Sequence, residues 1–236
     1  MKRKIVKDEP HQKYFLRDGS EVTGCSTIAK FGENPDGLIA WANREGLAGR
    51  DHRQAKDAAA DSGVIAHALA EAYLIGDELD LSDFTEEAQD LGRKAFEKFR
   101  EWWEVGDYTF LYSELQLTSE AHRFGGTLDI LCRTPRNKKC LIDLKATKSL
   151  RTSHLIQVVG GYLTLENENR PDDPVDEVCI LRLPKDGGKI EELWPEQETF
   201  PAYQKVFLAN LAAYNARHEL DKVDPIAKKY KRWKKR

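Results

Sequence analysis

Apolar residues recur along this chain in two patterns, one with the spacing of an α-helix and one with the alternation of a β-strand. The helical pattern predicts helices over residues 36–49, about 53–75, 85–103, 149–168 and about 196–218. The alternating pattern predicts strands from residue 108 and over residues 125–132, 140–145, 175–183 and 189–194. With 236 residues the chain can bury a sizeable interior, so we expect one large domain, or a core with helical additions.

The strands at 125–132 and 140–145 flank a Pro-containing turn and predict an antiparallel hairpin. Pairing Cys132 with Cys140 sets Asp129 opposite Asp143, with Cβ atoms roughly 5 Å apart. Two carboxylates this close repel each other unless one is protonated or a cation lies between them. Lys145 projects to the same side as Asp143, because side chains alternate along a strand. A one-residue slip would break this geometry, so the register is itself a prediction.

Two further residues are candidates for the same chemistry. Glu114 lies in mid-strand among apolar neighbours, where an unpaired carboxylate is costly, so we expect a cationic or metal partner. On the helix at 53–75, Gly63, His67 and Glu71 fall on one face. Gly63 would let another backbone approach, and His67 would then point at whatever is bound there. The alternative is that His67 is an ordinary core or surface histidine.

Composition narrows the class of protein. Apolar residues make up 40% of the chain and charged residues 33%. There is no apolar run near the roughly 18 residues of a membrane span and no signal-peptide pattern, so we expect a cytoplasmic protein without a membrane partner. Four cysteines without a Cys-x-x-Cys pair favour reduced, buried thiols over a disulfide framework or a zinc ribbon. They are Cys25, Cys132, Cys140 and Cys179.

The net charge of −3 conceals a basic C-terminal tail, residues 228–236. Seven of these nine residues are Lys or Arg and none is acidic, so the first 227 residues carry −10. The tail also contains two aromatic residues, and cations with aromatic rings are what phosphate neutralisation and base stacking require. We therefore expect nucleic-acid contact, although a merely solubilising terminus is the alternative. The cations that we expect to make it are Lys228, Lys229, Lys231 and Arg232, together with Lys148 after the hairpin.

In chain order these candidates form a set with the motif Gly126-Thr127-Leu128-Asp129, the Asp143-Leu144-Lys145 triplet, and Gln157 on the following helix. Over roughly residues 58 to 168 this set resembles the PD-(D/E)XK nuclease superfamily, specifically its RecB-like and phage-type exonuclease branch. The ordered combination is far more specific than any one of its members.

The resemblance implies a restriction-endonuclease-like core, with a central mixed β-sheet flanked by α-helices and helical N-terminal and C-terminal additions. The nuclease domain would cover residues 1–227, with its core at about 58–194. His67, Asp129, Asp143 and the main-chain carbonyl of Leu144 match metal ligands. Lys145 matches the catalytic lysine, Glu114 an acidic residue bordering the site, and Gln157 a residue that orients Lys145 or the DNA backbone. Mg²⁺ or Mn²⁺, as one or two ions, suits such an oxygen-rich site better than zinc does.

The sequence departs from the family pattern in three places. Val64 replaces the usual threonine of the helix motif. Tyr162 lies five residues after Gln157 instead of four, which on an α-helix turns it about 100° away, so no role is assigned to it. Some relatives hold an iron–sulfur cluster through three late cysteines, whereas here only Cys179 lies late, so we expect no cluster.

The implied activity is that of a metal-dependent DNA exonuclease in recombination, repair or phage DNA processing, acting on double- or single-stranded DNA. A structure-specific endonuclease, nickase or resolvase on the same core is an alternative, and so is a catalytically silent DNA-binding relative. The remaining hypothesis is that these residues have only a structural role, with Asp143 and Lys145 as an ion pair. Polarity, strand preference and assembly as a monomer or homo-oligomer stay open.

Overall fold

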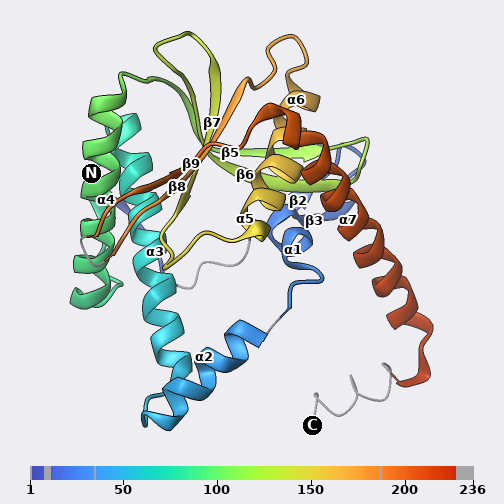
Figure 1. Cartoon of the computed structure of the whole chain (residues 1–236), viewed down its shortest axis with the longest axis horizontal. Helices are drawn as coiled ribbons and strands as arrows, with labels where there is room; N and C mark the ends of the chain where they lie inside the picture. The colour runs from blue at the N-terminus through green and yellow to red at the C-terminus, as the bar shows by residue number, and fades with distance from the viewer. Residues whose placement is uncertain (1, 8–11, 35, 186–187, 227–236) are drawn as a thin grey trace.

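A mixed β-sheet forms the centre of the molecule, with helices on both of its faces (Figure 1). The computed structural model describes residues 2–7, 12–34, 36–185 and 188–226. Within these ranges the sheet has the order β2-β3-β6-β7-β8-β9, with β5 beside β6. The strands are β2 (Tyr14–Phe15), β3 (Glu21–Gly24), β5 (Thr109–Ser119), β6 (Phe124–Arg133), β7 (Lys139–Lys145), β8 (Glu177–Arg182) and β9 (Glu191–Leu193). The central mixed sheet flanked by helices, expected for a restriction-endonuclease-like core, is confirmed.

The helices agree closely with those that the apolar spacing predicts. They are α1 (Cys25–Lys30), α2 (Asp36–Leu47), α3 (His52–Ile75), α4 (Glu86–Gly106), α5 (Thr152–Leu155), a π-helix (Ile156–Tyr162), α6 (Leu163–Asn169), a 3₁₀ turn (Gln197–Thr199) and α7 (Phe200–Val223). The Thr85 side chain caps α4 by accepting a hydrogen bond from the Ala88 N–H, which stabilises the helix start. Helix α1 and strands β2 and β3 were not predicted, because elements this short show no periodicity.

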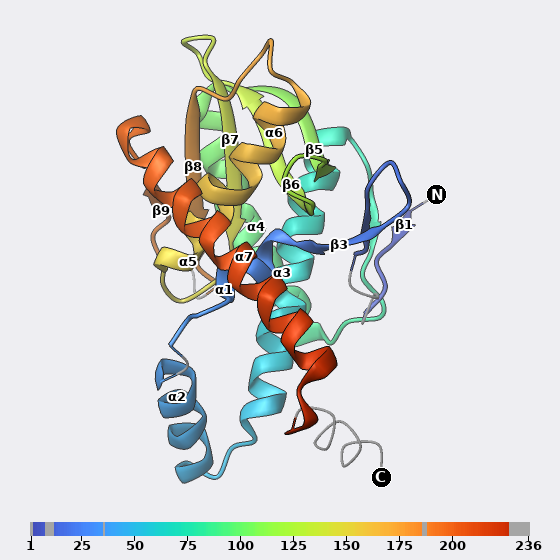
Figure 2. The same cartoon turned by 90° about the vertical axis from the view of Figure 1, so that its right-hand side faces the viewer.

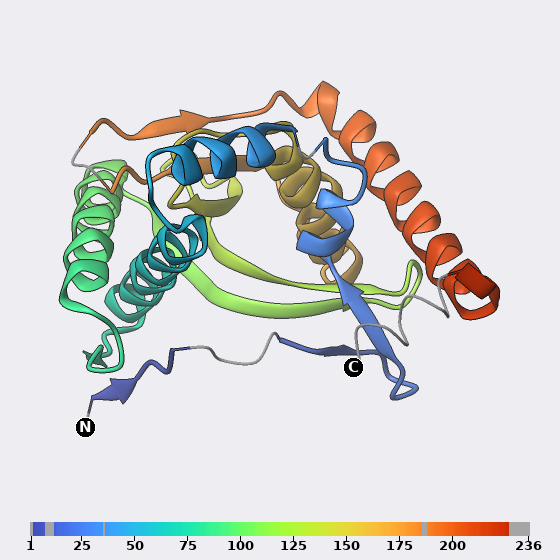
Figure 3. The same cartoon turned by 90° about the horizontal axis from the view of Figure 1, so that it is seen from below.

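The two faces of the sheet are covered by different helices. Helices α3 and α4 lie on one side of the β6–β7 hairpin, and the π-helix with α7 lies on the other (Figure 3). On the first side the core includes Cys140, Ile142 and Leu144, and on the second it includes Leu141. Helix α2 stands away from the sheet, beside α3 (Figure 2). The alternation predicted along β7 is therefore confirmed.

The predicted register of the hairpin is also confirmed, because Cys132 pairs with Cys140 in the antiparallel β6–β7 ladder. The ladder ends at Ile130 and Ile142, one pair before Asp129 and Asp143. Beyond it the Asp129 carboxylate accepts a hydrogen bond of 2.7 Å from the Leu144 N–H. The two strands thus separate where the carboxylates begin, which opens the end of the hairpin.

The strict alternation expected of a strand fails along β6 near this opening. Leu128 packs on the opposite side of the sheet from Ile130, although residues two apart on a regular strand share a face. On β5 the pairing shifts between Phe110 and Tyr112, so an extra residue interrupts the alternation. Glu114 further along has a left-handed φ of 47°, which costs free energy in a residue with a Cβ and recurs at functional sites.

Other predictions are confirmed or corrected by packing. All four cysteines are buried and free. Gly160 allows α7 to approach the π-helix closely, because a Cβ there would lie 2.6 Å from the Phe207 Cβ. On α7, Phe207 and Leu211 are buried whereas Val206 is 44% exposed. In the described part of the chain, no helix has both the length and the apolar composition needed to cross a membrane.

Candidate active site

Three side chains from separate elements converge at the open end of the hairpin. His67 lies on α3, Glu114 on β5 and Asp129 on β6, and each offers a ligand atom within 4.8 Å of those of the other two. The Nδ1 atom of His67 is 3.5 Å from the Asp129 Oδ2. An imidazole and two carboxylates at these distances form a group that can hold a divalent cation.

These residues face a cleft of about 780 Å³. One wall is the face of α3 that carries Gly63, His67 and Glu71, and a second wall is the N-terminal segment with β1 (Arg3–Lys4), which pairs with β4 (Leu79–Asp80). The end of β7 closes a third side. The remaining lining side chains that concern the site are Glu114, Asp129, Lys145 and Tyr162.

Gly63 was predicted to let another backbone approach α3, and this prediction is wrong. A Cβ at this position would have no backbone atom near it, and its closest contacts would be the Ala146 Cβ and the Lys185 Nζ, both at 3.9 Å. The bare face of α3 therefore accommodates side chains from the ends of two neighbouring strands. Glu71, one turn after His67, accepts a hydrogen bond of 2.6 Å from Arg3.

Asp143 and Lys145 form a tight pair at the floor of the cleft. The Lys145 Nζ lies 2.8 Å from Oδ1 and 2.7 Å from Oδ2 of Asp143. The Asp143 side chain is 1% exposed and that of Lys145 15%. The buried Oδ2 has its ammonium neighbour but no hydrogen bond of good geometry among the described residues. Asp143 is thus paired with Lys145 and stands outside the group of three converging ligand atoms.

Burial dominates the electrostatics of the site. Removal from water raises the pKa of Asp143 to about 6 even though Lys145 opposes the shift. Removal from water, followed by the charge of Asp129, raises the pKa of Glu114 to about 8, while part of its side chain stays exposed. Burial likewise raises the pKa of Asp129. The environment of these carboxyl groups thus favours their neutral form. A bound cation would instead favour the negatively charged carboxylates.

The histidine and the Leu144 backbone complete this arrangement. Burial, together with the charge of Lys145, lowers the pKa of His67 to about 4, so the imidazole is neutral at pH 7 and can act as a ligand. His67 also interacts with the backbone of Leu144, whose N–H is bound by Asp129. Leu144 therefore places its peptide group beside two of the three converging residues.

Gln157 and Tyr162 occupy the π-helix, and this corrects the prediction that their spacing separates them. A π-helix makes i to i+5 hydrogen bonds and brings residues five apart onto one face. The Gln157 Nε2 accordingly donates a hydrogen bond of 2.5 Å to the Tyr162 Oη. Tyr162 lines the cleft whereas Gln157 is buried behind it. The irregular helix restores a contact that a regular α-helix would lose.

Most of the predicted nucleic-acid contacts remain untested. Lys148 is exposed in the segment after β7, and Lys228, Lys229, Lys231 and Arg232 lie outside the described residues. Two cations near the site, Arg3 and Lys185, were missed. The first residues carry no pattern that would place Arg3. For Lys185 a signal existed, because β8 runs parallel to β7 and parallel strands end at one edge of a sheet.

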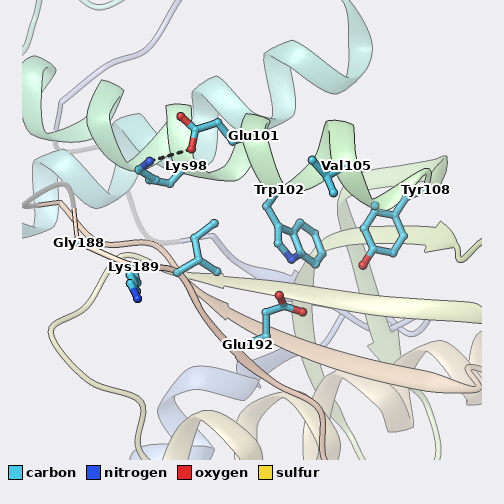
Figure 4. Close-up of a pocket in the computed structure, with 10 residues that line it drawn as sticks. Lys98, Glu101, Trp102, Val105, Tyr108, Gly188, Lys189 and Glu192 are labelled. Carbon is cyan, nitrogen blue, oxygen red and sulfur yellow. Dashed lines mark hydrogen bonds and ion pairs between the residues drawn. The ribbon is translucent and has the colours of Figure 1, made fainter.

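A second cavity, of about 720 Å³, lies between α4 and the strand end near β9 (Figure 4). Its aromatic wall is the stacked pair Trp102 and Tyr108, with ring centroids 4.8 Å apart. The charged groups beside them are engaged locally: Lys98 pairs with Glu101, and Glu192 accepts a hydrogen bond from Trp194. None of the predicted site residues lines it, whereas several of them line the cleft at His67, which is therefore the candidate active site.

The comparisons with known proteins do not identify the function of the chain, so any functional assignment depends on the residues described above. No family model and no curated protein matches the chain. Among solved structures it is similar to LHK-Exo in complex with dAMP, at 12% identity and a TM-score of 0.40, over 85% of this chain and 92% of that one. It is also similar to SSO0001, at 15% identity and a TM-score of 0.26, over 43% of this chain and 48% of that one, about half of its length. Neither match assigns an activity to this chain.

Proposed function

We propose that this protein is a divalent-metal-dependent deoxyribonuclease that hydrolyses phosphodiester bonds in the manner of an exonuclease. The observation that supports it is the convergence of His67, Glu114 and Asp129 beside the Asp143–Lys145 pair. The same residues carry the resemblance to the PD-(D/E)XK nucleases. Among the described residues that line the cleft there is no serine or cysteine.

The site suits a hard cation such as Mg²⁺ or Mn²⁺. Its ligands would be the carboxylates of Glu114 and Asp129, the imidazole of His67 and the carbonyl of Leu144, with Asp143 supplying further negative charge. Most of these ligand atoms are oxygens, and a bound cation would offset the negative charge of the carboxylates. When bound, the ion supplies Lewis-acid stabilisation of the phosphate oxygens and lowers the pKa of a water molecule.

The protein's own groups would orient the reactants. Asp143 holds the Lys145 ammonium at the floor of the cleft, where it would align the attacking water or offset charge on the phosphate. The Gln157–Tyr162 hydrogen bond fixes the phenol that borders the cleft. These contacts come from β7 and from the π-helix, so the reacting groups are set by the packing of the hairpin against that helix.

The assay that tests this function compares end-labelled linear DNA with closed circular DNA, each with Mg²⁺, Mn²⁺ or EDTA. We expect metal-dependent loss of the linear substrate and an intact circle, because an exonuclease needs an end. Cleavage of the circle would instead indicate an endonuclease. If neither DNA is cleaved with any divalent ion, the proposed activity is wrong.

The affinity for the metal is expected to increase with pH between 6 and 8. In the metal-free fold the pKa of Glu114 is raised to about 8, so at pH 6 a proton must leave before the carboxylate can bind. The gain is up to about tenfold per pH unit, less where solvent screens the carboxylate. His67 is already neutral over this range because its pKa is about 4. Calorimetric titration with Mn²⁺ at pH 6, 7 and 8 measures this.

The same proton has a second consequence in the metal-free protein. A carboxyl group whose pKa is raised in the fold contributes stability below its ordinary pKa near 4.5, and this contribution is lost as the pH rises through about 8. Glu114→Gln should flatten both the stability profile and the affinity profile. A Mn²⁺ affinity that stays constant or falls from pH 6 to 8 would contradict the ligand role of Glu114.

A further inference from the structure

A hydroxyl on the wall of the cleft is held by a tyrosine from the start of the chain. Tyr14 lies on β2, and its phenol oxygen is 3.1 Å from the Thr127 Oγ1 on β6. Thr127 lines the cleft and precedes Asp129, another lining residue, by two positions, the spacing at which strand residues share a face. This hydrogen bond joins segments 113 residues apart.

Two glycines create the space that the Tyr14 ring occupies. A Cβ on Gly125 would lie 2.4 Å from both the Cβ and the Cγ of Tyr14, and a Cβ on Gly24 would lie 2.9 Å from its ring. The Cβ and Cγ atoms lie next to the Tyr14 backbone and cannot swing away, so a side chain at Gly125 would displace the tyrosine. Gly24 and Gly125 pair in the parallel β3–β6 ladder. The backbone there is thus shaped to hold the phenol against Thr127.

The direction of the proton follows from the chemistry of the two hydroxyls. Among the described residues neither hydroxyl has another hydrogen-bond partner. A phenol is a stronger acid than an aliphatic alcohol and is therefore the better donor. With Tyr14 as the donor, the Thr127 oxygen accepts and its own proton is available to the cleft. The ionised carboxylates of Glu114 and Asp129 only accept hydrogen bonds, so they cannot bind the oxygens of a phosphate.

Thr127 lies beside the group of three converging ligand atoms and not within it. Two residues of an extended strand span about 6.8 Å, whereas the three ligand atoms lie within 4.8 Å of one another. A DNA strand whose reacting phosphate lies at Asp129 would therefore carry the adjoining part of its backbone past Thr127. Threonine hydroxyls, like lysine and arginine side chains, commonly donate hydrogen bonds to phosphate oxygens.

We propose that the Thr127 hydroxyl donates a hydrogen bond to the backbone phosphate next to the scissile one, and that Tyr14 is the positioning residue that directs this hydroxyl. The inference rests on the proposed nuclease function and adds to it a neutral contact with the substrate. Thr127 acts on the affinity for DNA, and Tyr14 acts through Thr127. The chemical step stays with the groups around Asp129.

The contact is measured by the anisotropy of a short fluorescein-labelled oligodeoxythymidylate in EDTA, over a range of KCl concentrations. Thr127→Val keeps the shape of the side chain and removes the hydroxyl, so we expect roughly tenfold weaker binding, as for a modest hydrogen bond to a charged group. The slope of log Kd against log salt should not change, because a neutral donor releases no counterion. Thr127→Ser should bind like the wild type. In hydrolysis Thr127→Val should raise KM by a similar factor with kcat little changed.

A double-mutant cycle tests the link to Tyr14. Tyr14→Phe keeps the ring on Gly125 and removes only the phenol oxygen, so we expect roughly threefold weaker binding with the same salt slope. Because Tyr14 acts through Thr127, the variant with both Tyr14→Phe and Thr127→Val should bind no more weakly than Thr127→Val alone. Tyr112→Phe and Thr109→Val, at exposed positions of β5 outside the cleft, are the matched controls and should match the wild type.

Four outcomes contradict the inference. Binding by Thr127→Val within about twofold of the wild type, in a protein that cleaves linear DNA normally, would overturn it and leave the proposed function standing. A lower salt slope for Thr127→Val would also overturn it, because charged contacts would then have been lost. Additive losses in the cycle would show that Tyr14 does not act through Thr127. If the wild-type protein neither binds nor cleaves DNA, the proposed function fails and this inference fails with it.

Discussion

Replacing Asp129 with asparagine is expected to lower hydrolysis of linear DNA by roughly 10³-fold, the equivalent of several kcal/mol of lost transition-state stabilisation. The metal-free variant should at the same time be more stable than the wild type. Burial raises the pKa of Asp129, so the fold disfavours its charge, whereas the asparagine oxygen can still accept the hydrogen bond from the Leu144 N–H. Function and stability therefore conflict at this position.

Thermal unfolding with and without Mn²⁺ checks both parts of this prediction. A ligand that binds the folded state stabilises it, by about 2.7 kcal/mol at a hundredfold excess over Kd. We expect Mn²⁺ to raise the Tm of the wild type and to leave that of Asp129→Asn unchanged. Asp90→Asn is the matched control, because Asp90 is a surface aspartate paired with Lys94. A Tm of the Asp129 variant that still rises with Mn²⁺ would show that Asp129 is not a ligand.

Lys145→Met is expected to reduce kcat by about 10²- to 10⁴-fold, the range found for groups that position a proton or stabilise charge in the transition state. KM should change little, since the ammonium would act on the reacting atoms and not on the rest of the strand. Asp143, which is 1% exposed, loses in this variant the ammonium that pairs with it. It should respond by keeping a proton at neutral pH, at a cost of about 1–3 kcal/mol in stability.

The Asp143 variants complete this test. Asp143→Asn or Asp143→Ala should also abolish cleavage, because Lys145 is then no longer held at the floor of the cleft. The double variant Lys145→Met with Asp143→Asn removes both charges and should recover stability without recovering activity. If Lys145→Met kept activity within tenfold of the wild type, the pair would be a structural ion pair only, and the chemistry would need another cation.

The hairpin is the part of the fold that local pattern predicts best. Alternation predicts which residues of β7 share a face, and the predicted register at Cys132 and Cys140 is confirmed. The failures lie where the pattern is interrupted. Leu128 lies on the other side of the sheet from Ile130, and Glu114 adopts a left-handed φ. A two-residue alternation pattern cannot predict such irregularities in a strand. These irregularities occur at the site itself.

The helix after the hairpin is a second case in which the local sequence pattern does not predict the geometry. Five-residue spacing between Gln157 and Tyr162 argues against contact on an α-helix, and only the π-helical turns bring the two side chains together. The cause lies in other parts of the chain: Gly160 packs against Phe207 of α7, and Gly161 packs near Cys25 of α1. Helix geometry here depends on packing that no local window contains.

The sequence by itself determines which residues are candidates for the site and how neighbouring candidates are oriented on one element. It places a histidine on a helix, two carboxylates on a hairpin and Lys145 on the same side as Asp143, because each of these relations depends on residues only a few positions apart. The tertiary structure decides which groups converge. It brings Glu114 together with His67 and Asp129, pairs Asp143 with Lys145, and places Lys185 near the bare face of Gly63. These contacts join segments tens of residues apart, and the packing of α3 and β8 against the sheet sets their distances.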